Sequence, residues 1–107
     1  MCGISGLISL SKDLGDNDYS TVKRMSDSIS HRGPDQQKIE KFDKILLANN
    51  RLKIMDLDDR SSLPMSSEDK SIWICYNGEI SNFRELKNKY KLLEKYNFKG
   101  TSDTEVM

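Results

Sequence analysis

The sequence predicts a mixed α+β domain, and three observations lead to this prediction. Short apolar runs bounded by polar residues are typical of strands, and such runs lie at residues 3–10, 45–48 and 72–76. Apolar residues spaced by three and four positions predict two amphipathic helices, one around Val22 and one over residues 82–93. A length of 107 residues limits the chain to one domain with a modest core.

The three apolar runs are expected to form strands that are covered on both faces. Residues 3–10, GISGLISL, alternate small and large side chains, and their glycines indicate a backbone packed closely against a neighbour. Residues 45–48, ILLA, and residues 72–76, IWICY, are continuous apolar runs of the kind found in fully buried strands. A further extended segment is expected at residues 52–57, before a loop at residues 58–70.

Both helices are expected to turn one apolar face toward the core. The first follows a polar loop at residues 12–18 and begins with a cap at Asp18, and its apolar face consists of Val22, Met25 and Ile29. The second has Asn82 and Glu85 at the spacing of a capping box. Its apolar face consists of Phe83, Leu86, Tyr90 and Leu93.

Composition and charge narrow the class of protein. The 17 basic and 17 acidic residues cancel, so no bulk electrostatic attraction favours nucleic acid or an anionic membrane as partner. No apolar run approaches the roughly 20 residues of a membrane span, and the first residues lack the pattern of a signal peptide. We therefore expect a soluble cytoplasmic protein in which Cys2 and Cys75 stay reduced. With His31 as the only histidine, no metal site is expected.

The first residues, MCGISG, place a cysteine directly after the initiator methionine. Removal of Met1 would leave Cys2 with its thiol and a free α-amine on one residue. A thiol with a pKa near 8.5 is only a few per cent ionised at pH 7, whereas an α-amine with a pKa of about 7.7 to 8.0 is suited to take its proton. Nucleophile and base would then belong to one residue, although Cys2 taken alone also fits an inert terminal cysteine.

Other residues would supply the remaining needs of such a site. The Asn77 amide and the Gly78 N–H, in the segment YNGE, are candidates for binding a tetrahedral oxyanion. Arg51 could bind a carboxylate in bidentate fashion, and Glu79 or Asp103 could pair with an ammonium group. A substrate with a carboxylate, an ammonium group and a carbonyl is an amino acid such as glutamine. Arg51 also fits a surface arginine, and Asp103 also fits a helix cap.

Six motifs occur in the order and spacing of one known family. They are MCGISG, HRGPDQQ (31–37), NRLKIMDL (50–57), PM (64–65), NGEISN (77–82) and SDTEV (102–106). Together they resemble the N-terminal glutaminase domain of asparagine synthetases, which are class II glutamine amidotransferases with the N-terminal nucleophile hydrolase fold. The resemblance covers essentially the whole chain.

The resemblance implies a four-layer α-β-β-α sandwich, present here as an incomplete portion because the family's domain is longer. Residues 1–107 would be the N-terminal part of the glutaminase domain, with its remainder and an ATP-dependent synthetase domain outside the sequence. The implied reaction is hydrolysis of glutamine to glutamate and ammonia, and the ammonia would amidate aspartate in the synthetase domain. Alternatives are a different carboxylate acceptor, such as a sugar acid, or an inactive portion that completes its sheets as a homodimer. ATP and magnesium would belong to the synthetase domain, with no cofactor in these residues.

The resemblance also assigns residues to the site. The catalytic residues would be Cys2 as nucleophile, with its α-amine as base, and Asn77 and Gly78 as the oxyanion hole. Those that bind substrate would be Arg51 for the α-carboxylate, Glu79 and Asp103 near the α-amino group, and Leu52, Ile54 and Met55 along the pocket. The loop at residues 31–35 would lie close by and serve ordering and closure.

The chain departs from the family pattern at three places. It has Asn49-Asn50 where a histidine is common, Leu63 where glutamine precedes PM, and Ser81 where tyrosine is usual. None of these positions carries a named catalytic role, so they concern the subfamily. Cys75, inside an apolar run, is expected to be a small buried hydrophobe.

Overall fold

The computed structural model describes residues 1–53 and 61–107, which fall into two compact units. The first unit comprises Met1–Lys53 and Ser62–Asn77, and the second contains Ser61 and Gly78–Met107. Helices and antiparallel strands both occur, so the predicted mixed α+β class is confirmed. No helix in the described part of the chain is long and apolar enough to span a membrane.

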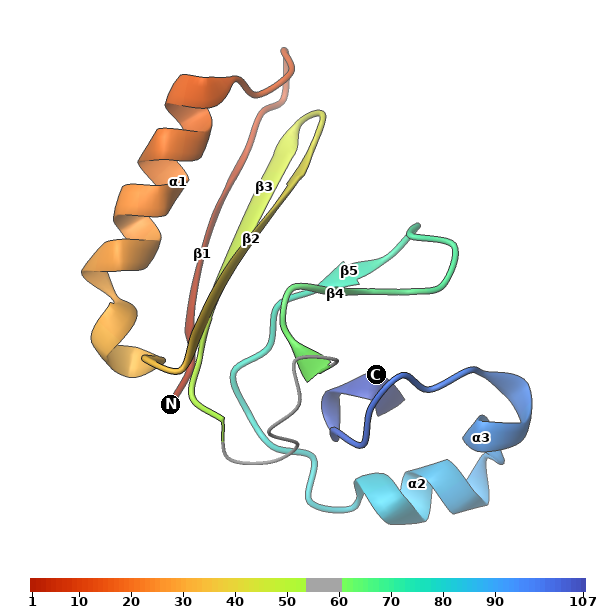
Figure 1. The fold of residues 1–107 in the computed structure, drawn as a ribbon. Helices are drawn as coiled ribbons and strands as arrows, with labels where there is room; N and C mark the ends of the chain where they lie inside the picture. Colours follow the sequence, from red (N-terminus) through yellow and green to blue (C-terminus); the bar gives the residue numbers. More distant parts are fainter. Residues whose placement is uncertain (54–60) are drawn as a thin grey trace. The chain divides into compact units, whose positions relative to one another are not determined.

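A three-stranded antiparallel sheet is the centre of the first unit (Figure 1). Its strands are β1 (Gly3–Ile8), β2 (Gln36–Phe42) and β3 (Ile45–Arg51), in the order β1-β3-β2. In the register of the sheet, Gly3 lies opposite Asn50 and Gln36 lies opposite Arg51. The end of the central strand therefore meets the beginning of both neighbours.

Helix α1 (Asp16–Ser28) packs against one face of this sheet (Figure 1). The core between them consists of Leu14, Val22, Leu46 and Ala48, with Leu7 and Ile39 packed against it. Val22 and Leu46 are completely buried. Removal of this apolar surface from water is the main force that holds helix and sheet together.

The other face of the sheet, called here the far face, carries Ile4, Lys38, Asn49 and Arg51. This follows from strand alternation, because the intervening Asn50 bonds to Ser26 of α1 and therefore faces the helix.

Residues 62–77 run along the far face. Lys38 Nζ lies 3.3 Å from the Pro64 carbonyl oxygen, the Phe42 and Trp73 rings are 4.3 Å apart, and Cys75 Sγ is 3.9 Å from the Ala48 carbonyl oxygen. Within this segment, β4 (Met65–Ser66) and β5 (Trp73–Ile74) form a short antiparallel pair.

The second unit is built from short helices. They are α2 (Phe83–Lys89), α3 (Leu92–Lys95) and a 3₁₀ helix at Thr104–Val106. Lys87 Nζ lies 4.3 Å from the Phe98 ring centroid. The Glu105 carboxylate accepts hydrogen bonds from the Lys99 and Gly100 N–H groups at 2.8 and 2.9 Å and so holds the intervening loop.

The predicted start and apolar face of the first helix are partly wrong. The helix begins at Asp16, and Asp18 stands at its third position, where its carboxylate accepts a hydrogen bond from the Gly15 N–H at 2.8 Å. Met25 is 39% exposed, whereas Ser26, one residue further on, is completely buried. The helix therefore turns a hydroxyl toward the sheet, where it finds polar partners.

The predicted helix over residues 82–93 is two helices. Lys91 adopts the left-handed conformation, with φ 50° and ψ 44°, which separates α2 from α3. Asn82 does precede α2, but its side chain makes no capping hydrogen bond, so the predicted capping box is wrong. The expected core face is only half-buried at Phe83 and is exposed at Tyr90 and Leu93, because so short a helix pair covers little surface.

The strands expected at the three apolar runs lie where they were predicted, but their predicted lengths and burial are wrong. The first strand ends at Ile8, and Ile4 and Ile8 are 45% and 65% exposed, so it is not covered on both faces. The run at residues 72–76 pairs only over Trp73–Ile74. Strand β2 was missed, because the sequence QQKIEKF is mostly polar. Of the extended segment expected at residues 52–57, residues 54–57 lie outside the described residues.

Candidate active site

Cys2 is held by its main chain at the beginning of the sheet. Its N–H donates a hydrogen bond to Asn77 Oδ1 at 3.1 Å, and its carbonyl oxygen accepts one from Arg32 Nε at 3.3 Å. The half-buried Cys2 and the exposed Asn77 are separated by 75 positions in the sequence. The structure thus brings together two of the three predicted catalytic residues, and the third, Gly78, follows Asn77 directly.

Arg51 stands at the same end of the sheet. Since Gly3 lies opposite Asn50, continuing the register by one residue puts Cys2 across from Arg51. Arg51 is the last residue of β3 and is only 6% exposed. A buried guanidinium requires polar or anionic partners, and the binding of a substrate carboxylate by Arg51 stays a prediction.

The loop at residues 31–35 packs against these strand ends. The Asp35 N–H donates to the Arg51 carbonyl oxygen at 3.2 Å, and Asp35 Oδ2 accepts from the Lys53 N–H at 2.8 Å. Gly33 lies so close to β3 that an added Cβ would be 2.1 Å from the Asn50 carbonyl oxygen. Only glycine fits there, and the loop therefore lies directly beside the Cys2 and Arg51 positions.

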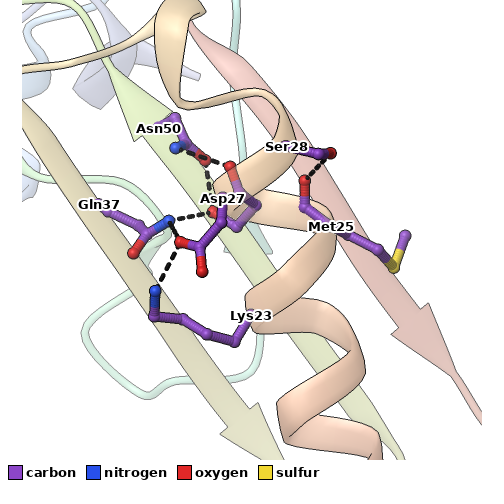
Figure 2. A network of polar contacts seen from close by, with 7 residues as sticks. Lys23, Met25, Asp27, Ser28, Gln37 and Asn50 are labelled. Carbon is purple, nitrogen blue, oxygen red and sulfur yellow. Dashed lines mark hydrogen bonds and ion pairs between the residues drawn. The ribbon is translucent and has the colours of Figure 1, made fainter.

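A polar network, buried at Ser26 and Asn50, links α1 to β2 and β3 (Figure 2). Ser26 Oγ donates to Asn50 Oδ1, and Asn50 Nδ2 donates to the Ser26 carbonyl oxygen at 3.1 Å. Gln37 Nε2 bonds to both Ser26 Oγ and Asp27 Oδ1 at 2.9 Å. Hydrogen bonds from Lys23 and then Gln37 lower the pKa of Asp27 below its ordinary value. This network fixes the part of β3 that precedes Arg51.

Sequence reasoning missed this network. Its signals were a serine, Ser26, four residues after the core residue Val22, and an asparagine, Asn50, at the end of an apolar strand. Polar residues at such buried positions have partners as a rule, so the two could have been matched to one another.

Two predicted substrate-binding residues lie together in the second unit. Asp103 Oδ2 accepts a hydrogen bond at 2.7 Å from the Ile80 N–H, which belongs to the peptide that joins Glu79 to Ile80. Asp103 is 6% exposed, while Glu79 is exposed. Asp103 also precedes the 3₁₀ helix, as the alternative reading expected, but its side chain makes no capping bond.

The structure describes only some of the remaining predicted residues. Leu52 is half-buried just after β3, and Ile54 and Met55 lie outside the described residues. Cys75 is half-buried, and burial raises its pKa to about 11, in keeping with an unreactive packing residue. Within residues 1–53 and 61–107, no group of three or more His, Cys, Asp or Glu side chains could hold a metal ion. A metal-free site stays a prediction.

Comparison with known proteins decides the family. The sequence profile of the glutamine amidotransferase domain matches residues 1–107, the whole chain. The chain belongs to this family. This result agrees with the resemblance noted from the six motifs, which is to the class II amidotransferase domain at the N-terminus of asparagine synthetases.

The relatives of this amidotransferase domain include several glutamine-hydrolysing asparagine synthetases. It is 40% identical over 108 residues to asparagine synthetase 2 of Bacillus subtilis (strain 168). It is 38% identical over 112 residues to the enzyme of Brassica oleracea and 36% identical over 107 residues to asparagine synthetase 2 of Oryza sativa subsp. japonica. Each match covers 100% of this chain but only 14%, 17% and 17% of the respective relative.

Proposed function

We propose that this amidotransferase domain is a glutaminase whose nucleophile is Cys2, released by removal of Met1. The observation that carries the proposal is the 3.1 Å contact between the Cys2 nitrogen and Asn77 Oδ1. It ties the proposed nucleophile to the proposed oxyanion-binding residue. Membership of the glutamine amidotransferase family supports glutamine as the substrate.

The first step is attack on the side-chain carboxamide of glutamine. A neutral α-amine has two hydrogens and one lone pair. One hydrogen is donated to Asn77 Oδ1, which leaves the lone pair to take the thiol proton. The thiolate then attacks the carbonyl carbon, and a carbon–sulfur bond forms as the carbonyl oxygen gains negative charge.

Asn77 is suited to bind that charge. Because its Oδ1 is engaged by the Cys2 nitrogen, its Nδ2 is directed away from that bond and can donate to the oxyanion. The Gly78 N–H provides a second donor, since it belongs to the peptide that follows Asn77. Two donors in fixed positions stabilise the tetrahedral intermediate more than they stabilise the bound substrate.

The second half of the reaction restores the enzyme. The carbon–nitrogen bond breaks, the leaving nitrogen takes the proton held by the α-amine, and ammonia departs from a thioester on Cys2. Water then attacks the thioester with the same amine as base. The products are glutamate and the free thiol, so atoms and charges balance.

The ends of the substrate are bound by charged groups. Arg51 binds the α-carboxylate in bidentate fashion, and its burial at the end of β3 supports this role. Glu79 and Asp103 bind the α-amino group, supported by their proximity within the second unit. Leu52, Ile54 and Met55 are proposed as pocket residues on the six-motif resemblance alone, since Ile54 and Met55 lie outside the described residues.

For the whole protein, we propose an asparagine synthetase-like enzyme of the cytoplasm. Residues 1–107 are then the N-terminal part of a four-layer N-terminal nucleophile hydrolase domain. The ammonia is used by an ATP- and magnesium-dependent synthetase domain that amidates aspartate. That these relatives are asparagine synthetases favours aspartate over another carboxylate acceptor.

The test is the intact mass of the purified protein before and after incubation with 6-diazo-5-oxo-L-norleucine, an electrophilic mimic of glutamine. We expect a mass without Met1 that gains one adduct, mapped to Cys2. Cys75 stays unlabelled and serves as an internal control, and Cys2→Ser gains no adduct. Retention of Met1, or a processed protein that stays unlabelled, would refute a working glutaminase site in this chain.

A further inference from the structure

Asn49 is a buried amide whose hydrogen-bonding groups are unused. Its side chain is completely buried. Within the described residues, neither Oδ1 nor Nδ2 has a hydrogen-bond partner. A buried donor and acceptor left without partners cost free energy, so such a pair indicates a ligand that completes them.

The register of the sheet places Asn49 beside the proposed site. Asn49 lies on the far face with Arg51, the next residue of β3 on that face, and directly opposite Ile4 of β1. Strand alternation from Ile4 leads next to Cys2 on the same face. Asn49 is therefore a diagonal neighbour of Cys2 and a same-strand neighbour of Arg51.

The segment that covers the far face passes over this position. Cys75 Sγ contacts the carbonyl oxygen of Ala48, the residue before Asn49, and two residues later Asn77 contacts the Cys2 nitrogen. Asn49 thus lies in the stretch of sheet between the Cys75 contact and the oxyanion-binding Asn77.

We propose that Asn49 binds the carboxamide of glutamine and discriminates it from the carboxylate of glutamate, an inference that rests on the proposed glutaminase function. A primary amide presents a donor beside an acceptor, and the Asn49 side chain presents the complementary acceptor and donor. Oδ1 accepts a hydrogen bond from the substrate –NH₂ group, and Nδ2 donates to the oxygen of the same carboxamide.

This arrangement explains selectivity through the –NH₂ group. Glutamate has only acceptor oxygens at that end, so one of them would face Asn49 Oδ1 without a proton between them. Sites that bond a specific substrate N–H discriminate strongly against analogues that lack it, because the partner group is then left unpaired. Glutamate, the product, would accordingly leave the site readily.

The experiment measures equilibrium binding of glutamine and glutamate by isothermal titration calorimetry in a Cys2→Ser background, where no turnover occurs. Asn49→Leu keeps the number and branching of the side-chain heavy atoms and has no polar atoms. We expect it to weaken glutamine binding by about 5- to 100-fold, as two lost neutral hydrogen bonds predict. Glutamate binding should change less, by about two-fold, because the lost Nδ2 donor is offset by removal of the Oδ1 that opposes a carboxylate oxygen. The control is Ile4→Val, which alters the cross-strand neighbour of Asn49 and is expected to change neither.

Equal weakening of both ligands, or no change in either, would overturn the proposal and leave Asn49 as the holder of a buried water. Should Asn49→Leu fail to fold, Asn49→Asp keeps the shape and replaces the Nδ2 donor by an acceptor. It is expected to weaken glutamate binding more than glutamine binding, and the opposite order would also overturn the proposal. Labelling of Cys2 tests the glutaminase function separately, because these binding constants do not depend on a reactive thiol.

Discussion

In the proposed mechanism Asn77 contributes two different groups, and its position in the structure makes them separable. Its oxygen receives the Cys2 N–H, which leaves its nitrogen for the substrate. The oxygen is engaged before the reaction begins, and the nitrogen interacts mainly with the oxyanion. Loss of such a residue should slow the chemical step more than it weakens substrate binding.

Replacement of Asn77 by alanine is therefore expected to lower kcat for glutamine hydrolysis by about 100- to 1,000-fold, the usual loss for one oxyanion donor, with a small change in KM. Steady-state release of glutamate measures both constants. Asn82→Ala is the matched control, because the Asn82 side chain makes no capping hydrogen bond. A loss expressed mainly in KM, or an equal loss in the control, would contradict the assigned role.

Burial is expected to make Cys75 the less reactive of the two cysteines. Burial raises the pKa of Cys75 to about 11. At pH 8 its thiolate fraction is about 0.001, so iodoacetamide should modify Cys2 and spare Cys75 until the protein unfolds. Peptide mapping after alkylation checks this, and prior modification of Cys75 in the folded protein would contradict it.

The same raised pKa has a consequence for stability at alkaline pH. The folded state holds the Cys75 proton more tightly than the unfolded chain does, whose thiol has a pKa near its ordinary value of 9.0. The free energy of unfolding should therefore fall as pH rises from about 9 through about 11. Cys75→Val should lose this part of the pH dependence when urea denaturation of the two proteins is compared across that window.

Among the elements, the pair of α1 and β3 determines the first unit. The helix contributes Val22 and the strand contributes Leu46 and Ala48 to one core, and the Ser26–Asn50 hydrogen bonds sit at the end of the same interface. The apolar contacts supply stability. The polar ones specify the position of the strand end that carries Arg51.

Leu46→Ala should destabilise the protein by about 2 to 5 kcal/mol, because a completely buried leucine leaves a cavity when it is truncated. Leu10→Ala provides the comparison, since Leu10 is 95% exposed and its truncation should change stability by less than about 0.5 kcal/mol. Urea denaturation monitored by circular dichroism measures both. Similar values for the two variants would mean that α1 does not pack on β3 in solution.

The molecule as a whole exposes features that favour self-association. Among the described residues, β1 and β2 are the edges of the three-stranded sheet, and Ile4 and Ile8 of β1 are largely exposed. Exposed edges with apolar side chains recruit further strands.

We expect the protein to self-associate in a concentration-dependent manner in sedimentation velocity experiments. Ile8→Lys places a charge on the edge strand and should shift the distribution toward monomer. A control substitution at an exposed position of the second unit, Tyr96→Lys, should leave it unchanged. A stable monomer over the whole dilution series would contradict the expectation.

Local patterns in the sequence were enough for the mixed α+β class and the approximate positions of β1, β3 and α1, and the six motifs correctly predicted that Cys2 and Asn77 lie together. Each of these rests on residue type and periodicity over a few positions, or on motifs in a fixed order. The break at Lys91, the burial of Ser26 in place of Met25 and the polar strand β2 were not predicted. Each of these depends on what the segment packs against.

The contacts at the candidate site also depend on the packing of distant segments. Cys2 meets Asn77 across 75 positions only because residues 62–77 return along the far face of the sheet, and Asn49 is buried there for the same reason. Hydrogen-bond partners distant in sequence leave no periodic pattern, since neither Cys2 nor Asn77 alone indicates the other. Residue types and their order thus determined the family and predict the class of reaction, whereas the packing of distant segments determines which groups lie together at the candidate site.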